Sequence, residues 1–323
     1  MALLIEPLAS AAQARAADAH TIEDLGVPGI VLMEHAGRAV AEAAGRFVPG
    51  LARAVVLAGP GNNGGDGWVA ARHLWGAGVP CPVVTLRAPD QLAGDAGLAA
   101  QMFLTAAEVH GWSSDALGAP FFLVDLADDV DALLRATAPG VVIDALFGTG
   151  LSRAVEGVAA NVIAAMGRAA APVLAVDVPS GLPTDGQAPT GPAVRAATTI
   201  TFGQRKVAHA CEPGLFLCGA TAVVDIGLLS PPNAGEPAAW RLLEAQSLVP
   251  ALDRQAHKGR FGHVGIVEGE PEHAGAAHLA ARAALRAGGG LCTLVVEGAP
   301  GRPPARWTRW WRWHRRCWRR CRV

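Results

Sequence analysis

The chain has 323 residues, which is enough for two domains that each bury a core of their own. Half of the residues are hydrophobic and none is tyrosine, a composition that excludes a mainly disordered protein and indicates an aliphatic core. The formal net charge of -1 conceals an asymmetry, because residues 301–323 hold nine arginines and no acid, whereas residues 1–300 carry 18 basic and 28 acidic residues. An acidic main body argues against nucleic-acid binding by the folded part.

The N-terminal stretch MALLIEPLAS is interrupted by Glu6 and Pro7, where a signal peptide needs a continuous apolar segment. No other segment offers the run of about 18 uncharged apolar residues that a membrane-spanning helix needs. Six cysteines occur without CxxC pairs, so a disulfide framework is not expected. We therefore expect a cytoplasmic protein that does not enter a membrane. Buried thiols are expected at Cys81, Cys211, Cys218 and Cys292.

The first part of the chain predicts alternating strands and helices. Residues 10–20 and 28–47 predict two helices, the second with Pro28 in its first turn. Helices are also expected in Ala-rich stretches such as 67–77 and 154–169. Seven short apolar runs predict buried strands: 53–58, 81–87, 121–125, 141–146, 172–178, 197–203 and 221–226. This alternation predicts a doubly wound, Rossmann-like α/β domain over residues 1–228, a parallel sheet with helices on both faces and ligands bound at the carboxyl ends of the strands.

The rest of the chain changes in character twice. Residues 229–240 are rich in Pro and Gly and predict a linker, and residues 241–300 predict a second unit with a strand within 257–269, a helix at 274–287 and a strand at 291–296. Residues 301–323 hold five of the nine tryptophans without any helical or strand period. Alternating Trp and Arg codons arise when a GC-rich Val/Ala stretch is translated out of frame, so we expect a frameshifted, disordered tail. The alternative is a membrane-active or nucleic-acid-binding segment.

The glycine-rich segment 59–67, GPGNNGGDG, follows a predicted strand and precedes a predicted helix. Its five glycines would let a ligand approach the backbone, and the helix start offers N–H groups to a phosphate. The segment matches GxGxxG, but the acid expected about 20 residues later for a ribose is missing. Arg87 stands there instead, either to contact a 2′-phosphate or to be solvated. A tight turn without a ligand is the alternative.

Two further loops follow predicted strands, at 144–153 and 177–181. The first contains Arg153, which could contact a phosphate, and the second contains a Pro-Ser-Gly turn after Asp177. A single aspartate at a strand end could merely cap the next helix. Three such loops at one edge of a sheet indicate a ligand site.

Together, the strings GPGNNGGDGWVAARHL, VIDALFGTGLSR and AVDVPSGL resemble the NAD(P)H-hydrate epimerase domain of the YjeF N-terminal family, as do residues 11–41. The resemblance spans roughly residues 8–228. It implies an isomerase that interconverts the R and S forms of NADHX and NADPHX, and a potassium ion held by Asn63, Asp144 and Ser180. The substrate contacts that it implies are Asn62, Asn63, Gly64, Gly65, Asp66, Gly148, Thr149, Gly150, Leu151, Ser152, Arg153, Ala154 and Asp177.

The implied chemistry takes place at C6 of the reduced nicotinamide ring, where a hydroxyl lies next to nitrogen. Expelling this hydroxyl as water, or opening the ring, makes a planar centre that can re-form with either stereochemistry. The reaction needs a proton donor and acceptor and a negative charge to stabilise the cation. Asp66, Asp144 and Asp177 are the candidates, and we favour Asp177 because Asp144 would hold the ion.

The second unit resembles the opening of the NAD(P)H-hydrate dehydratase domain, a ribokinase-like fold, through HKGRFGHV at 257–264 and the Ala-rich helix after it. The resemblance covers about 45 residues. The family's Gly-Gly-Ser reads Gly269-Glu270-Pro271, and its later glycine-rich loop with a catalytic aspartate is missing. We expect no dehydratase activity and a fragment that does not fold alone. A longer C-terminus would make the protein bifunctional.

Two other functions compete with the epimerase. A non-catalytic module that binds a nucleotide or associates with RNA would tolerate loss of the polar residues that the three loops retain. A hydride-transferring dehydrogenase would need the ribose-binding acid that is missing. The fold alone does not separate these functions. The sequence also leaves open a homodimer and the preference between NADHX and NADPHX.

Overall fold

The computed structural model describes residues 5–48, 50, 53–113, 119–124, 127–151, 153–231, 241–243, 257–268 and 274–296. The chain divides into two compact units, Met1–Ser247 and Leu248–Val323. The predicted tail 301–323 and most of the predicted linker, residues 232–240, lie outside the described residues.

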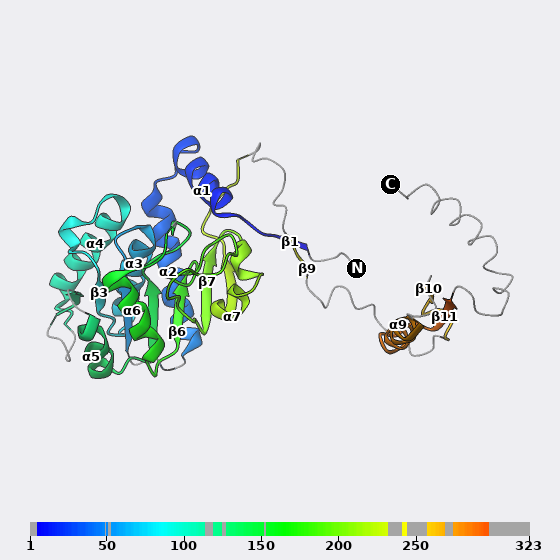
Figure 1. The fold of residues 1–323 in the computed structure, drawn as a ribbon. Coiled ribbons are helices and arrows are strands. Elements are labelled where there is room, and N and C mark those ends of the chain that lie inside the picture. Colours follow the sequence, from blue (N-terminus) through cyan, green and yellow to red (C-terminus); the bar gives the residue numbers. More distant parts are fainter. Residues whose placement is uncertain are drawn as a thin grey trace. The chain divides into compact units, whose positions relative to one another are not determined.

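The first unit is built on a seven-stranded, entirely parallel sheet (Figure 1). Its strands appear in the order β4-β3-β2-β5-β6-β7-β8, so the chain builds outward from β2 in one direction and from β5 in the other. This order confirms the predicted doubly wound, Rossmann-like sheet. The strands are β2 (Ala54–Ala58), β3 (Val83–Thr85), β4 (Phe121–Leu123), β5 (Val141–Ala145), β6 (Val173–Val176), β7 (Thr198–Phe202) and β8 (Ala220–Val224).

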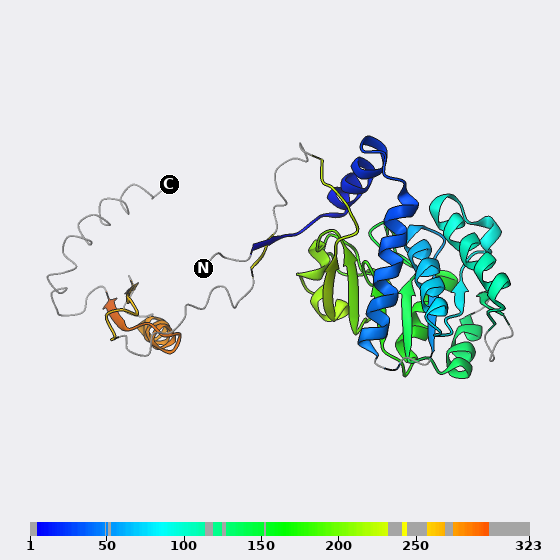
Figure 2. The same ribbon diagram turned by 180° about the vertical axis from the view of Figure 1, so that it is seen from behind.

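Helices cover both faces of this sheet, and Figure 2 shows the long helix α2 in blue lying across one of them. Both predicted N-terminal helices are present, but Pro28 is the N-cap of α2 and not part of its first turn, because its ψ of 133° is extended. The helices are α1 (Ala11–Ala19), α2 (Gly29–Phe47), α3 (Asn62–Gly76), α4 (Gly94–His110), α5 (Ala127–Thr137), α6 (Gly157–Arg168) and α7 (Gly214–Cys218).

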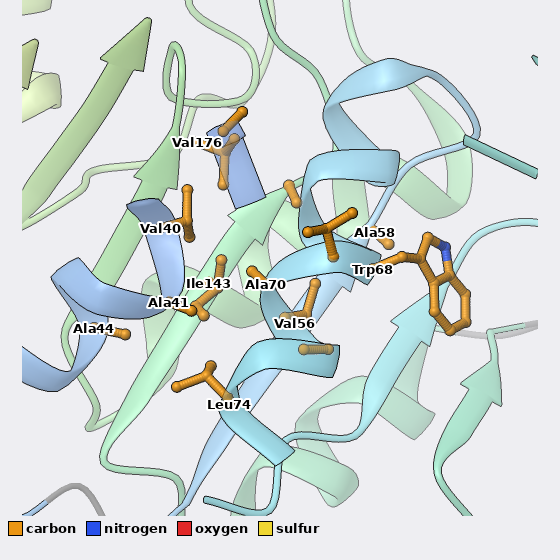
Figure 3. Close-up of a cluster of buried hydrophobic side chains, with 14 of the residues drawn as sticks. Val40, Ala41, Ala44, Val56, Ala58, Trp68, Ala70, Leu74, Ile143 and Val176 are labelled. Carbon is orange, nitrogen blue, oxygen red and sulfur yellow. The ribbon is translucent and has the colours of Figure 1, made fainter. Parts of the chain in front are cut away.

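The alternation of side chains along the strands divides the core into two clusters. In β2, Val56 points to the face covered by α2, α3 and α4, whereas Leu57 points to the face covered by α5 and α6. Figure 3 shows the first cluster, in which Val56 and Ile143 lie against Val40 and Leu74. Each Val, Leu or Ile side chain that is fully buried contributes about 1.5–3 kcal/mol. The continuous apolar strands are therefore explained by burial on both faces.

The glycine-rich segment 59–67 differs from its prediction as a loop. Helix α3 begins at Asn62, so most of the segment forms helical turns. A Cβ on Gly64 would fall on the carbonyl oxygen of Gly59, and one on Gly67 would lie 2.7 Å from the Cβ of Ala145. These glycines allow α3 to pack closely against its neighbours. The helical spacing of apolar residues in the sequence does not show that glycines are needed for this close packing.

The N-terminal segment contacts the residues that follow β7. Strand β1 (Ile5–Pro7) pairs antiparallel with β9 (Arg241–Leu243), and Ala9 forms a parallel bridge with Lys206 after β7. Ser10 then caps α1, since its hydroxyl accepts from the Gln13 N–H while the Gln13 side chain accepts from the Ser10 N–H. Helix α1 is thereby fixed next to the residues that follow β7.

The second unit contains two parallel strands, β10 (His263–Glu268) and β11 (Leu291–Val296), joined by helix α9 (Ala274–Arg286). The predicted strand, helix and strand are thus confirmed. Cys81 and Cys218 are buried as predicted, but Cys211, just before α7, and Cys292, in β11, are partly exposed, contrary to the prediction. Within the described ranges, no helix is long and apolar enough to cross a membrane.

Candidate functional site

The three predicted loops meet at one cavity of about 870 Å³ in the first unit. The cavity lies where the strand order reverses between β2 and β5, the place where open α/β sheets bind ligands. Of the sequence-predicted contacts, those that line it are Asn62, Asn63, Asp66, Gly148, Thr149, Gly150, Leu151, Arg153 and Asp177. Those absent from its lining are Gly64, Gly65, Asp144, Ala154 and Ser180, and Ser152 lies outside the described residues.

The N-terminus of α3 forms one wall. Gly61 is its N-cap and supplies no side-chain hydrogen bond, so the N–H groups of the first turn remain available to an anion. A Cβ on Gly61 would meet nothing within 4 Å, whereas Gly64 and Gly65 are buried against other parts of the protein. Gly64 and Gly65 therefore serve helix packing, and the predicted contacts of these two glycines with a substrate stay predictions.

Asp177 and Lys206 form a buried ion pair at the cavity. The Lys206 Nζ donates to Asp177 Oδ1 at 2.6 Å, and also to the Thr201 hydroxyl and the Phe202 carbonyl, so its three hydrogens are all used. Burial alone would raise the pKa of Asp177, but the charge and hydrogen bond of Lys206 overcome this effect and lower it. Asp177 is therefore an anion at neutral pH.

The backbone around Asp177 is strained and held from two sides. Its φ of 64° is unusual for a residue other than glycine, although aspartate tolerates it better than most. The His209 ring accepts from the Lys206 N–H at Nδ1 and lies 3.0 Å from the Asp177 carbonyl at Nε2. Burial lowers the pKa of His209 to about 4, so this ring is neutral and donates through Nε2.

Asp66 has the opposite character to Asp177. Its carboxyl lines the cavity and makes no hydrogen bond with the described part of the chain. Burial raises the pKa of Asp66 well above its ordinary value, and the charges of Asp177 and Asp18 raise it further. Asp66 therefore holds a proton more tightly than Asp177 does, and both carboxyl groups belong to the lining of one cavity.

Asp144 and Ser180 lie behind the loop that follows β5. The Ser180 N–H and hydroxyl donate to the two carboxylate oxygens of Asp144 at 2.8 and 2.6 Å. The Ser180 hydroxyl oxygen in turn accepts from the Phe147 N–H and lies 3.2 Å from the Phe147 carbonyl. Burial raises the pKa of Asp144 to about 6. Asp144 and Ser180 are therefore in contact, as an ion site would require.

Several residues in or next to the cavity were not found by the sequence analysis. Lys206, Thr201 and His209 surround Asp177, and Asp18 on α1 lines the same cavity. Lys206 could have been suspected, because it follows a predicted strand at the edge where the three loops meet. Asp18 had no such signal, since helix α1 comes before the sheet. The other candidate, Arg87, is exposed and outside the cavity lining, which favours the solvated alternative.

Comparisons with known proteins agree with this geometry. Residues 29–208 match the family described as YjeF-related protein N-terminus, a match over more than half of the chain. The NAD(P)H-hydrate epimerase of Limosilactobacillus fermentum is 38% identical over 222 residues, which are 69% of this chain and 98% of that protein. The crystal structure of yeast ynu0 has the same fold, with a TM-score of 0.57, 21% identity, and 73% of this chain and 99% of that chain covered.

Longer relatives also match. The bifunctional NAD(P)H-hydrate repair enzyme Nnr of Moorella thermoacetica is 37% identical over 303 residues, and that of Thermofilum pendens is 37% identical over 289 residues. These matches cover 90% and 86% of this chain but only 54% and 51% of the relatives, so the chain spans about half of their length. The sequence match, the fold and the three loops show that this chain belongs to the YjeF N-terminal family.

Proposed function

We propose that the chain is an isomerase that epimerises NADHX and NADPHX at C6 of the nicotinamide ring. The observation that carries this proposal is that Asp66 and Asp177 line one cavity with pKa values shifted in opposite directions, upward for Asp66 by burial and downward for Asp177 by Lys206. The similarity to the NAD(P)H-hydrate epimerase of Limosilactobacillus fermentum, nearly all of which this chain covers, supports it. The comparisons give no support to the alternative of a non-catalytic binding module.

The first step removes the C6 hydroxyl. Asp66 donates its proton to the hydroxyl, the C6–O bond breaks, and the bonding electrons leave with the oxygen as water. The lone pair of the ring nitrogen forms a C=N bond, so the ring becomes cationic and C6 planar. Water then adds to the other face and returns a proton to Asp66, so that atoms and electrons balance.

Asp177 stabilises the cation without taking a proton from it. Loss of the C5 proton from the cation would complete a dehydration, so an epimerase must keep strong bases away from C5. A carboxylate whose pKa is held low by Lys206 is a weak base and still a negative charge. We therefore assign proton transfer to Asp66, whereas the sequence analysis favoured Asp177 for this role.

The phosphates of the substrate would bind at the open N-terminus of α3. The free N–H groups of its first turn and the positive end of the helix favour an anion there. Arg153 and residues 148–151 line the same cavity from the loop after β5. We propose that these groups hold the pyrophosphate while the ring lies between Asp66 and Asp177.

A potassium ion fits the residues behind this loop. Asp144 is fully buried and has no cationic partner within the described ranges, a costly arrangement unless a cation compensates its charge. Its carboxylate, the Ser180 hydroxyl and the Phe147 carbonyl supply oxygen ligands. Asn63 lies against Gly148, and its buried amide nitrogen has no partner among the described residues. Its side-chain oxygen is the atom that could serve as a further ligand. When bound, the ion would neutralise Asp144 and hold the loops together.

The remaining parts of the proposal concern the whole protein. We propose that it works in the cytoplasm and that it forms a homodimer, which light scattering after size-exclusion chromatography would test. Residues 1–228 would be the epimerase domain, 229–240 a linker and 241–300 a partial dehydratase domain without activity of its own. A direct assay of (S)-NADHX dehydration would test the last point.

The decisive experiment is the rate of conversion of (R)-NADPHX to the S form, coupled to an excess of an S-specific dehydratase. We expect Asp66→Asn to lower kcat by about 10²–10⁴-fold, because an amide cannot supply the proton. Asp177→Asn should also lower kcat, but it breaks a buried ion pair, so its unfolding temperature must be measured as well. Replacing potassium by choline should reduce the rate in the wild type.

The matched control is Asp90→Asn, an exposed carboxyl outside the cavity lining, which should keep the wild-type rate. Folded wild-type protein that gives no acceleration over the spontaneous reaction would overturn the proposed function. Full activity of Asp66→Asn would leave the function standing and overturn the assignment of the proton to Asp66.

A further inference from the structure

We propose that Asp18, on the N-terminal helix, is a third carboxyl of the site, whose negative charge adds to that of deprotonated Asp66 and favours the cationic ring. This inference rests on the proposed function and deepens it. Asp18 precedes the sheet and lies in the N-terminal stretch of residues 11–41, not in one of the three loops. Its role follows from its place in the cavity and from the charges of its neighbours.

The structure holds Asp18 at the cavity from both ends of its helix. Before α1, the Ala9 N–H donates to the Arg205 carbonyl and the Val207 N–H donates to the Ala9 carbonyl, which joins this segment to the residues on both sides of Lys206. After α1, the Thr21 hydroxyl is hydrogen-bonded to both the carbonyl and the N–H of Leu229. The helix between these anchors forms a wall of the cavity.

One face of α1 is turned toward this cavity. Ala14, Arg15, Ala17, Asp18 and, one turn later, Ile22 line it. None of the residues of α1 is buried, so the helix does not serve as a core element. Asp18 makes no hydrogen bond or ion pair within the described part of the chain, so it has no evident structural task.

Counting charges around Asp66 identifies what Asp18 adds. Lys206 and Asp177 neutralise each other in their ion pair, the His209 ring is neutral, and Asp66, whose pKa is raised by burial, carries no charge while it holds its proton. Among the described groups that act on Asp66, Asp18 alone then remains with no partner of opposite charge. Burial and the charge of Asp177 raise the pKa of Asp18, and the charge of Lys206 lowers it. Once Asp66 has given its proton to the hydroxyl, Asp66 and Asp18 both present negative charge to the cation.

Other charged groups of the cavity do not cancel Asp18. Arg15 lies three residues earlier on the same helix but forms no ion pair with it, and Arg153 belongs to the loop after β5. Asp95 lies against Gly29 at the start of α2. Because Asp95 is acidic, it cannot neutralise the charge of Asp18. The pyrophosphate of the substrate would occupy the two arginines.

The function of Asp18 differs from those of the other two carboxyls. Asp66 moves the proton and Asp177 shares its charge with Lys206. Asp18 adds a negative charge that is present before the proton moves and that matters more as the ring becomes positive. A charge that acts mainly on the cation lowers the barrier more than it improves binding of the neutral ring. Its removal should therefore affect kcat more than KM.

The test compares Asp18→Asn, which keeps the shape and removes the charge, with Asp18→Glu, which keeps the charge. We expect Asp18→Asn to lower kcat at least tenfold with KM within about threefold of the wild type, and Asp18→Glu to recover part of the loss. The unfolding temperature should stay unchanged. The limb of the pH profile in which the rate falls with rising pH should move to lower pH, since the charge of Asp18 favours protonated Asp66.

A binding measurement tests the same charge without turnover. NADP⁺ has a planar cationic ring and NADPH a neutral one, so the ratio of the Kd of NADPH to that of NADP⁺ should be at least threefold lower in Asp18→Asn than in the wild type. The matched control is Glu23→Gln, an exposed carboxyl near the same helix and outside the cavity lining, which should change neither kcat nor this ratio.

The outcomes separate this inference from the proposed function. An active wild type with an equally active Asp18→Asn and an unchanged Kd ratio overturns the role of Asp18 and leaves the epimerase standing. An inactive wild type overturns the epimerase, and the Kd ratio still decides whether Asp18 faces the ring. Equal losses in Asp18→Asn and Asp18→Glu with lowered unfolding temperatures would make Asp18 a structural residue and overturn the inference.

Discussion

The two units of the chain begin from the same local pattern and reach different degrees of burial. Both contain parallel strands joined by an Ala-rich helix. In the first unit, Leu57 and Val56 of the central strand are 0% exposed, whereas in the second unit Val267 is 59% and Leu279 is 69% exposed. A strand-helix-strand unit buries its apolar residues only when further strands and a second layer of helices cover it.

The number of strands in each unit also decides where a ligand site can form. The first unit has strands on both sides of the β2–β5 reversal, and its cavity lies at that reversal. The second unit has two described strands, β10 and β11, and two parallel neighbours have no point at which the order reverses. We therefore place the activity in the first unit, and the following predictions test this contrast.

The largest effect is expected for helical glycines. Gly64→Ala should lower the free energy of unfolding by about 5 kcal/mol or more, because its Cβ would strike the Gly59 carbonyl. Gly275→Ala in α9 meets nothing within 4 Å and should raise helix stability by up to about 1 kcal/mol. Urea unfolding followed by circular dichroism measures both. Equal effects of the two substitutions would contradict the contrast.

A second pair compares leucines. Leu57→Ala should cost about 2–5 kcal/mol, since it leaves a cavity between the sheet and its helices. Leu279→Ala should change the free energy of unfolding by less than about 0.5 kcal/mol, because the side chain is already in water. The same urea titrations apply. A cost above about 2 kcal/mol for Leu279→Ala would show that its face is covered in solution.

Potassium should stabilise the first unit in a pH-dependent way. The folded-state pKa of Asp144 is about 6, above its ordinary 3.8, so without a cation its contribution to stability falls as the pH rises from about 4 to 6. Potassium binds the ionised form and should restore about 1.4 kcal/mol at pH 7 when present at ten times its Kd. At pH 5, where Asp144 is mostly protonated, the gain should be much smaller.

Thermal unfolding in potassium chloride and in choline chloride measures this effect. Asp144→Asn should lose the difference between the two salts and its pH dependence. An equal gain at pH 5 and pH 7 would contradict the assignment of the ion to Asp144.

The smallest effect is expected for exposed arginines. Arg153→Ala should raise KM about fivefold with little change in kcat, because an exposed arginine contributes a modest interaction to phosphate binding. Arg282→Ala in α9 should leave both parameters unchanged. Steady-state kinetics of the epimerase reaction measure KM and kcat of both variants. An equal rise of KM in both would show that the loss of any positive charge weakens binding, and would contradict a specific contact of Arg153 with the phosphate.

The sequence predicted the fold more completely than the site. All seven strands and both N-terminal helices were found from apolar runs and helical spacing, because burial on both faces of a sheet leaves a clear local pattern. The start of α3 was missed, since glycines that pack closely and glycines that form a loop look alike in a sequence. The assignment of domains to 1–228, 229–240, 241–300 and 301–323 stays a prediction.

By itself, the sequence determined which loops form the site, because strand ends and their motifs are local features. Only the tertiary structure decided how the carboxyls differ. Asp66, Asp144 and Asp177 have the same ordinary pKa, and their proton affinities separate through burial and through Lys206, which is 29 residues from Asp177 in the chain. It also brought Asp18 from the N-terminal helix to the same cavity, a contact that no local pattern encodes.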